Sequence, residues 1–317
     1  MTAIYIILGV LAFLLLAFVL VCEIGFKLIF GGTNEVSGAR YEKNFDKKLP
    51  PEFAKIMNEG REYGKTLPWE EVYIDSYDGY KLHGKLYAPK DAKICFVLCH
   101  GYKESGDHDF SGIIRTYAEK GYALLLVDQR AHVKSEGKYI CFGIKERYDI
   151  RDWCRYLDER LGLKIILSGV SMGTTSVLLA ACLPDISKNL IAVTADCGFN
   201  SMYDEFVHVA KNMIGVPTFP FLNVLELMCK KRLGIDMRAV RISDEIKNIK
   251  VPVFFLHGEA DGFVPCENSI VMHEACPTEK RLVTVAGAEH GLSYLVDNER
   301  CERELLSFLE KVTNERV

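Results

Sequence analysis

Short, almost continuously apolar segments recur along the chain and alternate with stretches of helical periodicity. The segments that predict strands are 94–99, 122–127, 164–168, 191–195, 251–256 and 281–286. Strands this apolar are buried on both faces, as in a parallel sheet that is covered by helices. Amphipathic helices are predicted over 109–119, 144–161, 172–183, 266–276 and 294–312. Because crossovers between parallel strands are right-handed, we expect an open, doubly wound α/β fold with a mostly parallel sheet.

Two further segments extend this core, and we expect the folded domain to cover 69–317. The stretch VYIDSYDGYKLHGKLYAP predicts a hairpin that turns at Asp78 and Gly79. The connection over about 199–242 is too long for a crossover and carries two apolar helical faces, separated by prolines. We expect this insertion to form a helical lid over the carboxyl ends of the strands, with its aromatic residues lining a pocket. The alternative is that these residues pack into the main core.

The N-terminal segment differs in composition from the rest of the chain. No charged residue occurs from Ile4 to Cys22, a run long enough to cross the hydrocarbon core of a membrane. No Lys or Arg precedes this run and no A-x-A site follows it, which favours an uncleaved anchor over a secretory signal; a buried core helix is the other alternative. We expect a single-pass transmembrane anchor over 1–30, then a linker and one docking helix over 31–68. Basic residues only follow the anchor, which favours a cytoplasmic location for the rest of the protein.

Charge and cysteine content exclude several classes of function. The formal net charge is −4, so the chain lacks the basic field that nucleic-acid binding requires. An odd number of cysteines, 11, cannot pair fully within one chain. Several cysteines lie in or beside predicted strands or helices, where small core residues are expected: Cys95, Cys99, Cys182 and Cys197. No Cys-x-x-Cys occurs, so neither a zinc site nor a thioredoxin-like site is predicted.

One serine lies at the corner between a predicted strand and a predicted helix. The segment Gly169-Val-Ser171-Met-Gly173 has the spacing and the context of a nucleophile elbow. Such a turn strains the backbone of the serine and brings neighbouring segments close, so it needs residues without bulk on either side. A helix N-cap is the alternative role for this serine, but a cap does not need both glycines.

Two residues that suit a serine nucleophile follow later strands. Asp261 comes after the fifth predicted strand, in HGEADGFVP, and His290 comes after the sixth, in AGAEHG. The carboxyl ends of parallel strands meet at one edge of the sheet, so we expect these residues to lie beside Ser171. His290 would take the proton of Ser171, and Asp261 would orient the imidazole ring. Asp196, which follows the strand 191–195, is the alternative acid.

The loop after the first apolar strand completes the predicted site. Cys99-His100-Gly101-Tyr102 ends that strand, and we expect the main-chain N–H groups of Tyr102 and Met172 to form an oxyanion hole. His100 is expected to hold the loop through its side chain. Asp128 and Arg130 are expected to form a local ion pair under the site.

From about residue 70 to 312, the chain resembles the α/β-hydrolase superfamily, and within it the membrane-anchored bacterial esterases and serine-aminopeptidase-like proteins. The resemblance rests on HGY, DQRAHVKSEG, GVSMG, HGEADGFVP and AEHG. Proteins of this branch often have glycine where Ala131 and Val133 stand. The resemblance implies an α/β-hydrolase fold, and hydrolysis of an ester, thioester or amide through an acyl-serine without cofactor or metal.

These observations predict a membrane-anchored serine hydrolase that cleaves an acyl ester with Ser171, His290 and Asp261. A serine aminopeptidase or amidase, acting on peptides, and a thioesterase are the alternatives on the same residues. The insertion carries acidic and basic residues together, so its charge does not decide between ester and amine-bearing substrates. A catalytically inactive, membrane-tethered binding protein is the alternative from another class.

Overall fold

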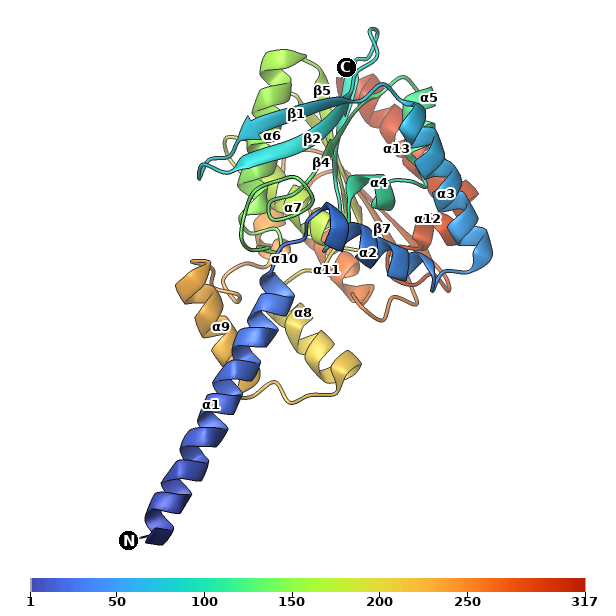
Figure 1. Cartoon of the computed structure of the whole chain (residues 1–317). Coiled ribbons are helices and arrows are strands. Elements are labelled where there is room, and N and C mark those ends of the chain that lie inside the picture. Colours follow the sequence, from blue (N-terminus) through green and yellow to red (C-terminus); the bar gives the residue numbers. More distant parts are fainter. Residues whose placement is uncertain (1, 317) are drawn as a thin grey trace.

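The body of the molecule is built around one eight-stranded sheet in the computed structural model, which describes residues 2–316 (Figure 1). The strands are β1 (Glu70–Asp75), β2 (Lys81–Tyr87), β3 (Ile94–Cys99), β4 (Ala123–Val127), β5 (Lys164–Val170), β6 (Leu190–Asp196), β7 (Val253–Gly258) and β8 (Lys280–Val285). Their order in the sheet is β1-β2-β4-β3-β5-β6-β7-β8. The pairs β1–β2 and β2–β4 are antiparallel, and all later pairs are parallel. This confirms the predicted doubly wound, mostly parallel sheet.

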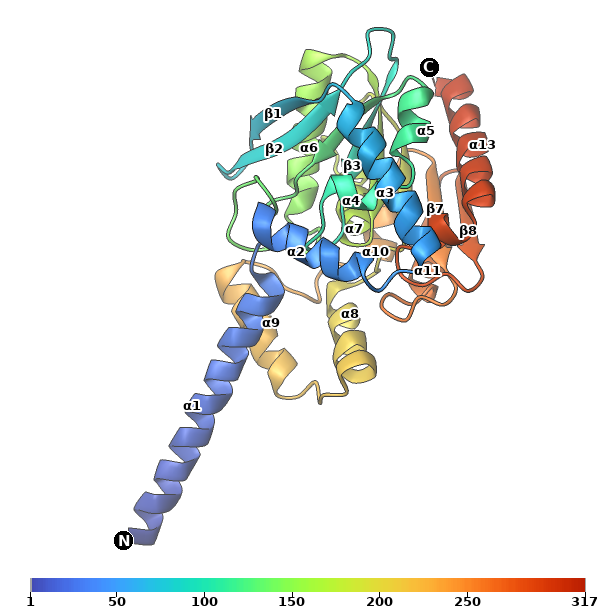
Figure 2. The ribbon, with the colours of Figure 1, turned by 45° about the vertical axis from the view of Figure 1, so that its right-hand side comes forward.

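Helices cover both faces of the sheet (Figures 1 and 2). Side chains alternate along each strand, so Val97 and Leu167 point to one face and Phe96 and Ile166 to the other. The first face packs against α6 (Glu146–Arg160), α7 (Met172–Ala181), α10 (Ile242–Glu245) with η2 (Ile246–Asn248), and α11 (Glu267–Ala275). The second packs against α5 (Ile114–Glu119) and α13 (Asn298–Arg316). Two predicted helices are interrupted, because α4 (Gly106–Asp109) and α12 (Ser293–Val296) are separate short helices.

The segment between the anchor and the sheet contains two helices, where the sequence analysis expected one. Helix α2 (Glu35–Asp46) precedes α3 (Pro51–Thr66), the helix that was predicted. A capping box begins α2: Asn34 Oδ1 accepts from the Ser37 amide at 2.9 Å, and Ser37 Oγ accepts from the Asn34 amide at 2.9 Å. Two otherwise unpaired amides are satisfied in this way. The pattern Asn-x-x-Ser was therefore the missed sequence signal.

Helix α1 (Thr2–Phe30) projects from the body as a single long helix (Figures 1 and 2). Among the described residues, it is the one helix whose length and composition suffice to cross a membrane. Its two parts differ in exposure, since Cys22, Phe26 and Phe30 are buried while the large apolar residues of its first half are exposed. The last turns of α1 are therefore part of the folded domain.

The insertion packs against these last turns of α1. It comprises α8 (Met202–His208), the π-helix η1 (Val209–Ile214) and α9 (Phe221–Arg232). The rings of Phe206 and Phe30 stack with centroids 5.8 Å apart. A methyl group on Gly25 would lie 2.8 Å from the ring of Phe221. The expectation that the aromatic residues of the insertion line a pocket is therefore corrected, because Phe206 and Phe221 hold α1 instead.

The burial of Phe26 and Phe30 predicts that α1 contributes to the stability of the whole domain. Phe26→Ala and Phe30→Ala each remove a fully buried ring, so each is expected to lower the free energy of unfolding by about 3–5 kcal/mol. Urea unfolding of the full chain in mild detergent measures this change. Phe13→Ala is the matched control, because Phe13 is 68% exposed on the same helix. Equal stability of all the variants would show that α1 is only a tether.

Candidate active site

Ser171 lies at a sharp turn between β5 and α7, as the sequence predicts. Its backbone has φ 54° and ψ −116°, in a region that residues with a side chain rarely adopt. The flanking glycines explain how the chain reaches this turn. A methyl group on Gly173 would overlap the carbonyl oxygen of Cys99 at the end of β3, and one on Gly169 would overlap the backbone of Gly173. The close approach of α7 to β3 and β5 thus requires glycine at both positions.

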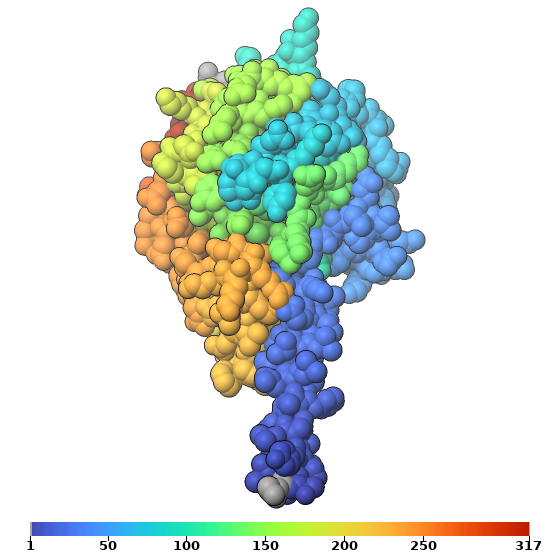
Figure 3. All heavy atoms as spheres, turned by 60° about the vertical axis from the view of Figure 1, so that its left-hand side comes forward, coloured from blue at the N-terminus to red at the C-terminus, as the bar shows by residue number. Residues whose placement is uncertain are grey.

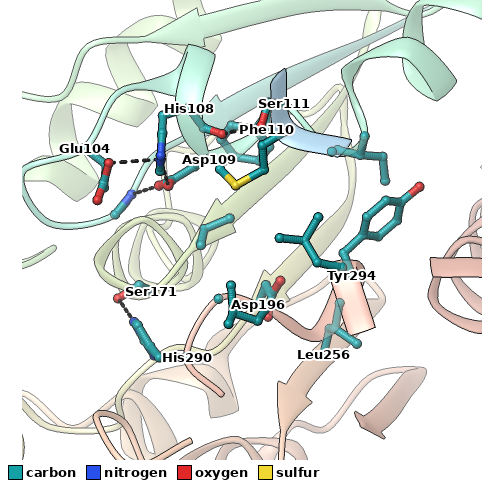
Figure 4. A pocket seen from close by; sticks show the side chains of 18 of the residues that line it. Glu104, His108, Asp109, Phe110, Ser111, Ser171, Asp196, Leu256, His290 and Tyr294 are labelled. Atoms are coloured by element: carbon teal, nitrogen blue, oxygen red, sulfur yellow. Dashed lines mark hydrogen bonds and ion pairs between the residues drawn. The ribbon is translucent and has the colours of Figure 1, made fainter. Parts of the chain in front are cut away.

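The structure brings the three predicted residues Ser171, His290 and Asp261 together. Figure 4 shows Ser171 and His290 facing each other. Ser171 Oγ lies 2.9 Å from Nε2 of His290. On the other side of the ring, Nδ1 lies 2.7 Å from Oδ2 of Asp261. A carboxylate only accepts hydrogen bonds, so Nδ1 carries a proton and Nε2 faces the serine as an acceptor. This arrangement prepares Nε2 to take the hydroxyl proton.

Asp261 is held in its ionised form by hydrogen bonds. The amides of Phe263 and Val264 donate to its Oδ1 at 2.9 and 2.8 Å, and Nε2 of His257 lies 3.2 Å from its Oδ2. Burial alone would raise the pKa of this carboxyl, but the bonds from His257 and His290 outweigh burial and lower the pKa to about 2. Asp261 is therefore charged at neutral pH.

Asp196, the alternative acid, occupies a different place. It ends β6 and lines the pocket beside Ser171, where its Oδ1 has no hydrogen-bond partner among the described residues (Figure 4). Burial raises its pKa to about 7. Nδ1 of His290 bonds to Asp261 and not to Asp196, which lies in the wall of the pocket.

The two predicted oxyanion-hole residues lie on either side of the nucleophile. In the part of the chain from 2 to 316, the main-chain N–H of Tyr102 and that of Met172 donate to no protein acceptor. The Gly101 amide beside them donates to Asp109 Oδ2 at 2.6 Å. His100 holds the loop as expected, because its Nε2 accepts from the Gln129 amide at 3.1 Å.

The oxyanion loop also contacts the end of α1. The hydroxyl of Tyr102 donates to the carbonyl oxygen of Ile29 at 2.7 Å, and Lys103 Nζ donates to that of Leu28 at 2.6 Å. The side chain of Met172 lies in the same apolar cluster as Phe26 and Phe30. Helix α1 therefore supports both residues that the sequence places at the oxyanion hole.

The expected ion pair between Asp128 and Arg130 does not form. Arg130 instead bonds to Asp149 of α6 at 2.6 Å and to Asp78 of the β1–β2 turn at 2.9 Å. Asp128 bonds to Nδ1 of His83 on the neighbouring strand β2, also at 2.6 Å. The hairpin and α6 meet at Arg130 only in the folded chain, so sequence proximity suggested the wrong partner.

A cavity of about 820 Å³ opens beside Ser171 and His290. One wall comes from α2, α3 and the loop between them, through Tyr41, Phe45, Leu49, Phe53 and Met57. Tyr117, Tyr294 and Leu256 line the side beyond Asp196. The insertion contributes only Met213 among the described residues. The pocket is thus roofed mainly by the segment 31–68, for which a linker and one docking helix were predicted.

A buried charged cluster that the sequence analysis missed lies in the roof of this pocket. His108 Nδ1 lies 3.0 Å from Glu104, and Nε2 lies 3.1 Å from Asp46 at the end of α2. Burial opposes the charge on His108, but bonds to Asp109 and Glu104 outweigh it and raise its pKa to about 11. The protonated ring thereby ties α2 to the loop whose Asp109 holds Gly101.

Two groups of side chains bring potential metal ligands together: Glu104, His108 and Asp109, and Cys197, Asp261 and His290. In each group, a histidine already bonds to a carboxylate, so a cation would have to replace these bonds. The donor atoms present are therefore engaged in hydrogen bonding rather than arranged around a vacant position.

Glu205 of α8 gives the region of the site a pH-dependent stability. Its side chain is buried, its Oε1 has no partner among residues 2–316, and burial together with the charge of Asp261 raises its pKa to about 8. The protonated form is favoured in the folded state. Its contribution to stability is therefore full below about pH 4.5, the ordinary value, and is lost as the pH rises towards 8.

Glu205→Gln is expected to raise the free energy of unfolding at pH 8 but to leave it nearly unchanged at pH 4.5. The difference from the unmodified chain grows by about 1.4 kcal/mol for each pH unit between these values. Chemical unfolding at several pH values measures the slope. The neighbouring, exposed Asp204 provides the control, since Asp204→Asn lacks the burial that causes the effect. A difference that does not change with pH would contradict the assignment.

Solved structures with the same fold include hydrolases. The Pyrococcus furiosus esterase Pf2001 superimposes with a TM-score of 0.64 and 22% identity, over 78% of this chain and 93% of that one. Est1E from Butyrivibrio proteoclasticus gives 0.57 and 20%, over 77% and 99%. Pyrococcus horikoshii acylaminoacyl peptidase gives 0.57 and 18%, over 78% of this chain and 42% of that chain. The shared fold is that of the α/β hydrolases.

Sequence comparisons extend the likeness to the family level. The protein YqkD of Bacillus subtilis, described as uncharacterized, is 25% identical over 243 residues, which cover 76% of this chain and 79% of YqkD. The sequence model of the X-Pro dipeptidyl-peptidase (S15) family matches residues 78–241. This match spans the hairpin turn, the oxyanion loop, the nucleophile elbow and the insertion. Because it covers more than half of the chain, the protein belongs to the S15 family and is a serine hydrolase of the α/β-hydrolase superfamily.

Proposed function

We propose that the protein is a membrane-anchored hydrolase of acyl esters, which forms an acyl-serine at Ser171. The observation that carries this proposal is the hydrogen-bonded chain from Ser171 Oγ through His290 to Asp261, at the edge of an 820 Å³ cavity. Ser171 is the nucleophile, His290 the general base and acid, and Asp261 the group that orients His290.

The proposed reaction has two halves. Ser171 Oγ attacks the ester carbonyl carbon while Nε2 of His290 takes the hydroxyl proton. The N–H groups of Tyr102 and Met172 stabilise the oxyanion, the bond to the alcohol oxygen breaks, and His290 returns the proton to the leaving alcohol. Water then attacks the acyl-serine, with His290 first taking a proton from the water and then giving it to Ser171. The acid is released and the enzyme is restored.

The walls of the cavity support an apolar acyl group. Phe45, Leu49, Phe53 and Met57 face it from α2 and α3, and Leu295 faces it from α12. A cavity of this size accommodates a ligand as large as a drug molecule, so acyl chains well beyond acetyl fit. The chain-length optimum is therefore expected at medium or long acyl chains.

A peptidase is the second candidate, and the family membership favours it. The carboxylates of Glu104, Asp109 and Asp196 also line the cavity, and a carboxylate is what a substrate amine would need. The triad, which cleaves esters and amides by the same steps, does not distinguish the two. A substrate panel does.

The buried end of α1 supports an anchor that is retained rather than a signal that is removed. Cleavage within α1 would take away Cys22, Phe26 or Phe30 and open an apolar cluster. The basic residues that follow α1 favour a catalytic domain on the cytoplasmic side. They are Lys27, Arg40, Lys43, Lys47 and Lys48.

The first test is an activity panel on the full chain in detergent micelles. We expect hydrolysis of p-nitrophenyl esters between acetyl and palmitoyl, and complete loss of it in Ser171→Ala. Asp261→Asn is expected to lower kcat by up to about 10⁴-fold, because the histidine tautomer is no longer fixed. Asp196→Asn is the matched control and is expected to retain the serine chemistry.

Aminoacyl and glycyl-prolyl p-nitroanilides run in the same panel separate the two candidates. Turnover of the anilides without turnover of the esters would replace the esterase by the peptidase. Ester hydrolysis that survives in Ser171→Ala would refute both. Circular dichroism and labelling by a fluorophosphonate probe confirm that an inactive variant is folded and identify the reactive serine.

A further inference from the structure

The insertion ends in an exposed apolar turn, which we call the tip and define as residues 211–220. Every residue of the tip except Thr218 is exposed. Its large apolar side chains include Phe219, 76% exposed, and Ile214, 64% exposed, together with Met213 and Val216. Monomeric soluble proteins rarely expose apolar side chains in such a cluster without a partner. No acidic residue occurs from Phe206 to Leu225, and Lys211 is the one charged residue of the tip.

The tip lies on the side of the body from which α1 projects. Figures 1 and 2 both show the turn between η1 and α9 reaching along α1 towards its N-terminal end. In the space-filling view, gold and orange atoms of the insertion contact the blue helix, and α1 continues alone beyond them (Figure 3). Phe18 of α1 packs against the cluster that contains Leu222 and Leu225 of α9. The contact therefore extends past Cys22 into the uncharged run.

An ion pair marks where this contact crosses from polar to apolar surroundings. Glu23, the first charged residue of α1, pairs with Arg232 at the C-terminal end of α9, with Nη1 and Oε2 2.9 Å apart. The residues of α1 that precede Glu23 are all uncharged. In α9, the charged residues before Arg232 are Glu226, Lys230 and Lys231, and the first turn of the helix is apolar. The ion pair therefore joins the charged end of α9 to the first charged residue of α1.

The length of α1 fixes the depth of the tip. At 1.5 Å per residue, the run from Ile4 to Cys22 extends about 28 Å, which matches a hydrocarbon core of about 30 Å. Ala17 and Phe18 are already partly covered by the protein. If the insertion stayed in water, only the residues from Ile4 to Leu16 would remain for the membrane, about 20 Å. That length is too short, so a bilayer that fits α1 also surrounds the tip.

We propose that the tip inserts into the bilayer that α1 spans and docks the mouth of the pocket on the lipid surface. Met213 belongs both to the tip and to the lining of the cavity beside Ser171 and His290. A substrate that leaves the bilayer at the tip therefore reaches the nucleophile along protein surface. Resting on the proposed function, this names the substrate class as acyl esters carried in the membrane, with an acyl chain long enough to partition into lipid.

Tryptophan quenching by brominated lipids tests the docking without any activity. The full chain is reconstituted into phosphatidylcholine nanodiscs, with and without bromine on the acyl chains. The native Trp69 and Trp153 give a constant background. We expect the added emission of Phe219→Trp to be quenched like that of Leu14→Trp in α1. Tyr73→Trp is the control, because Tyr73 is half exposed on β1, on the side of the body away from the free end of α1.

Two results of the quenching experiment would overturn the docking. Emission from Phe219→Trp that is quenched no more than that from Tyr73→Trp places the tip in water. Emission from Leu14→Trp that is not quenched means that α1 does not span the bilayer. The depth of α1 then gives no reason to place the tip in lipid. Neither result depends on whether the protein hydrolyses an ester.

A pair of substrates tests the link between docking and substrate class. Phe219→Asp and Ile214→Asp are expected to lower hydrolysis of a long-chain ester carried in vesicles by about tenfold or more, since a charge in lipid is costly. Hydrolysis of a soluble short-chain ester is expected to stay unchanged, because neither residue lines the cavity. Val271→Asp, on the exposed face of α11, is the matched control. Equal loss on both substrates, or loss on neither, would contradict a role in lipid access.

Discussion

Helix α7 can begin directly behind Ser171 only because the backbone of Gly173 lies against the carbonyl of Cys99, with no space for a side chain. This close approach forces Ser171 into its left-handed, strained conformation and aims its hydroxyl away from the sheet. Asp261 and His290 reach the hydroxyl from the loops that follow β7 and β8. Met172, the first residue of α7, faces the other way and packs on the end of α1. The elbow thus fixes the position of Ser171 and of the residue that packs on α1.

The parts that sequence predicted well are those determined by local pattern. Six strands were recognised because buried strands are largely apolar, and their observed bounds lie within two residues of the predicted ones. The loop 128–137 adds a finer example. Glycine is common in the family where Ala131 and Val133 stand, yet both residues keep left-handed backbones, with φ 61° and 49°. The loop therefore keeps its conformation although Ala131 and Val133 have strained backbones.

The parts that sequence did not predict depend on which surfaces meet. An amphipathic pattern in 199–242 shows that a face is buried, but not what covers it, and the partner was α1 rather than the pocket. In the same way, Arg130 finds Asp149 and Asp78 from other elements, while the nearest acid in sequence, Asp128, turns to His83. Long-range pairing follows from the arrangement of the layers, which no local pattern contains.

The contact between α1 and the oxyanion loop makes α1 part of the support of the site. Tyr102 and Lys103 donate to the last carbonyls of α1, which have no partners of their own in the helix. These bonds hold the loop that contains the Tyr102 amide proposed for the oxyanion hole. A change in the tilt or depth of α1 is therefore transmitted to Tyr102 first, since the buried Phe26 and Phe30 prevent the helix from sliding past the domain. The position of α1 and the geometry of the site are coupled through one short contact.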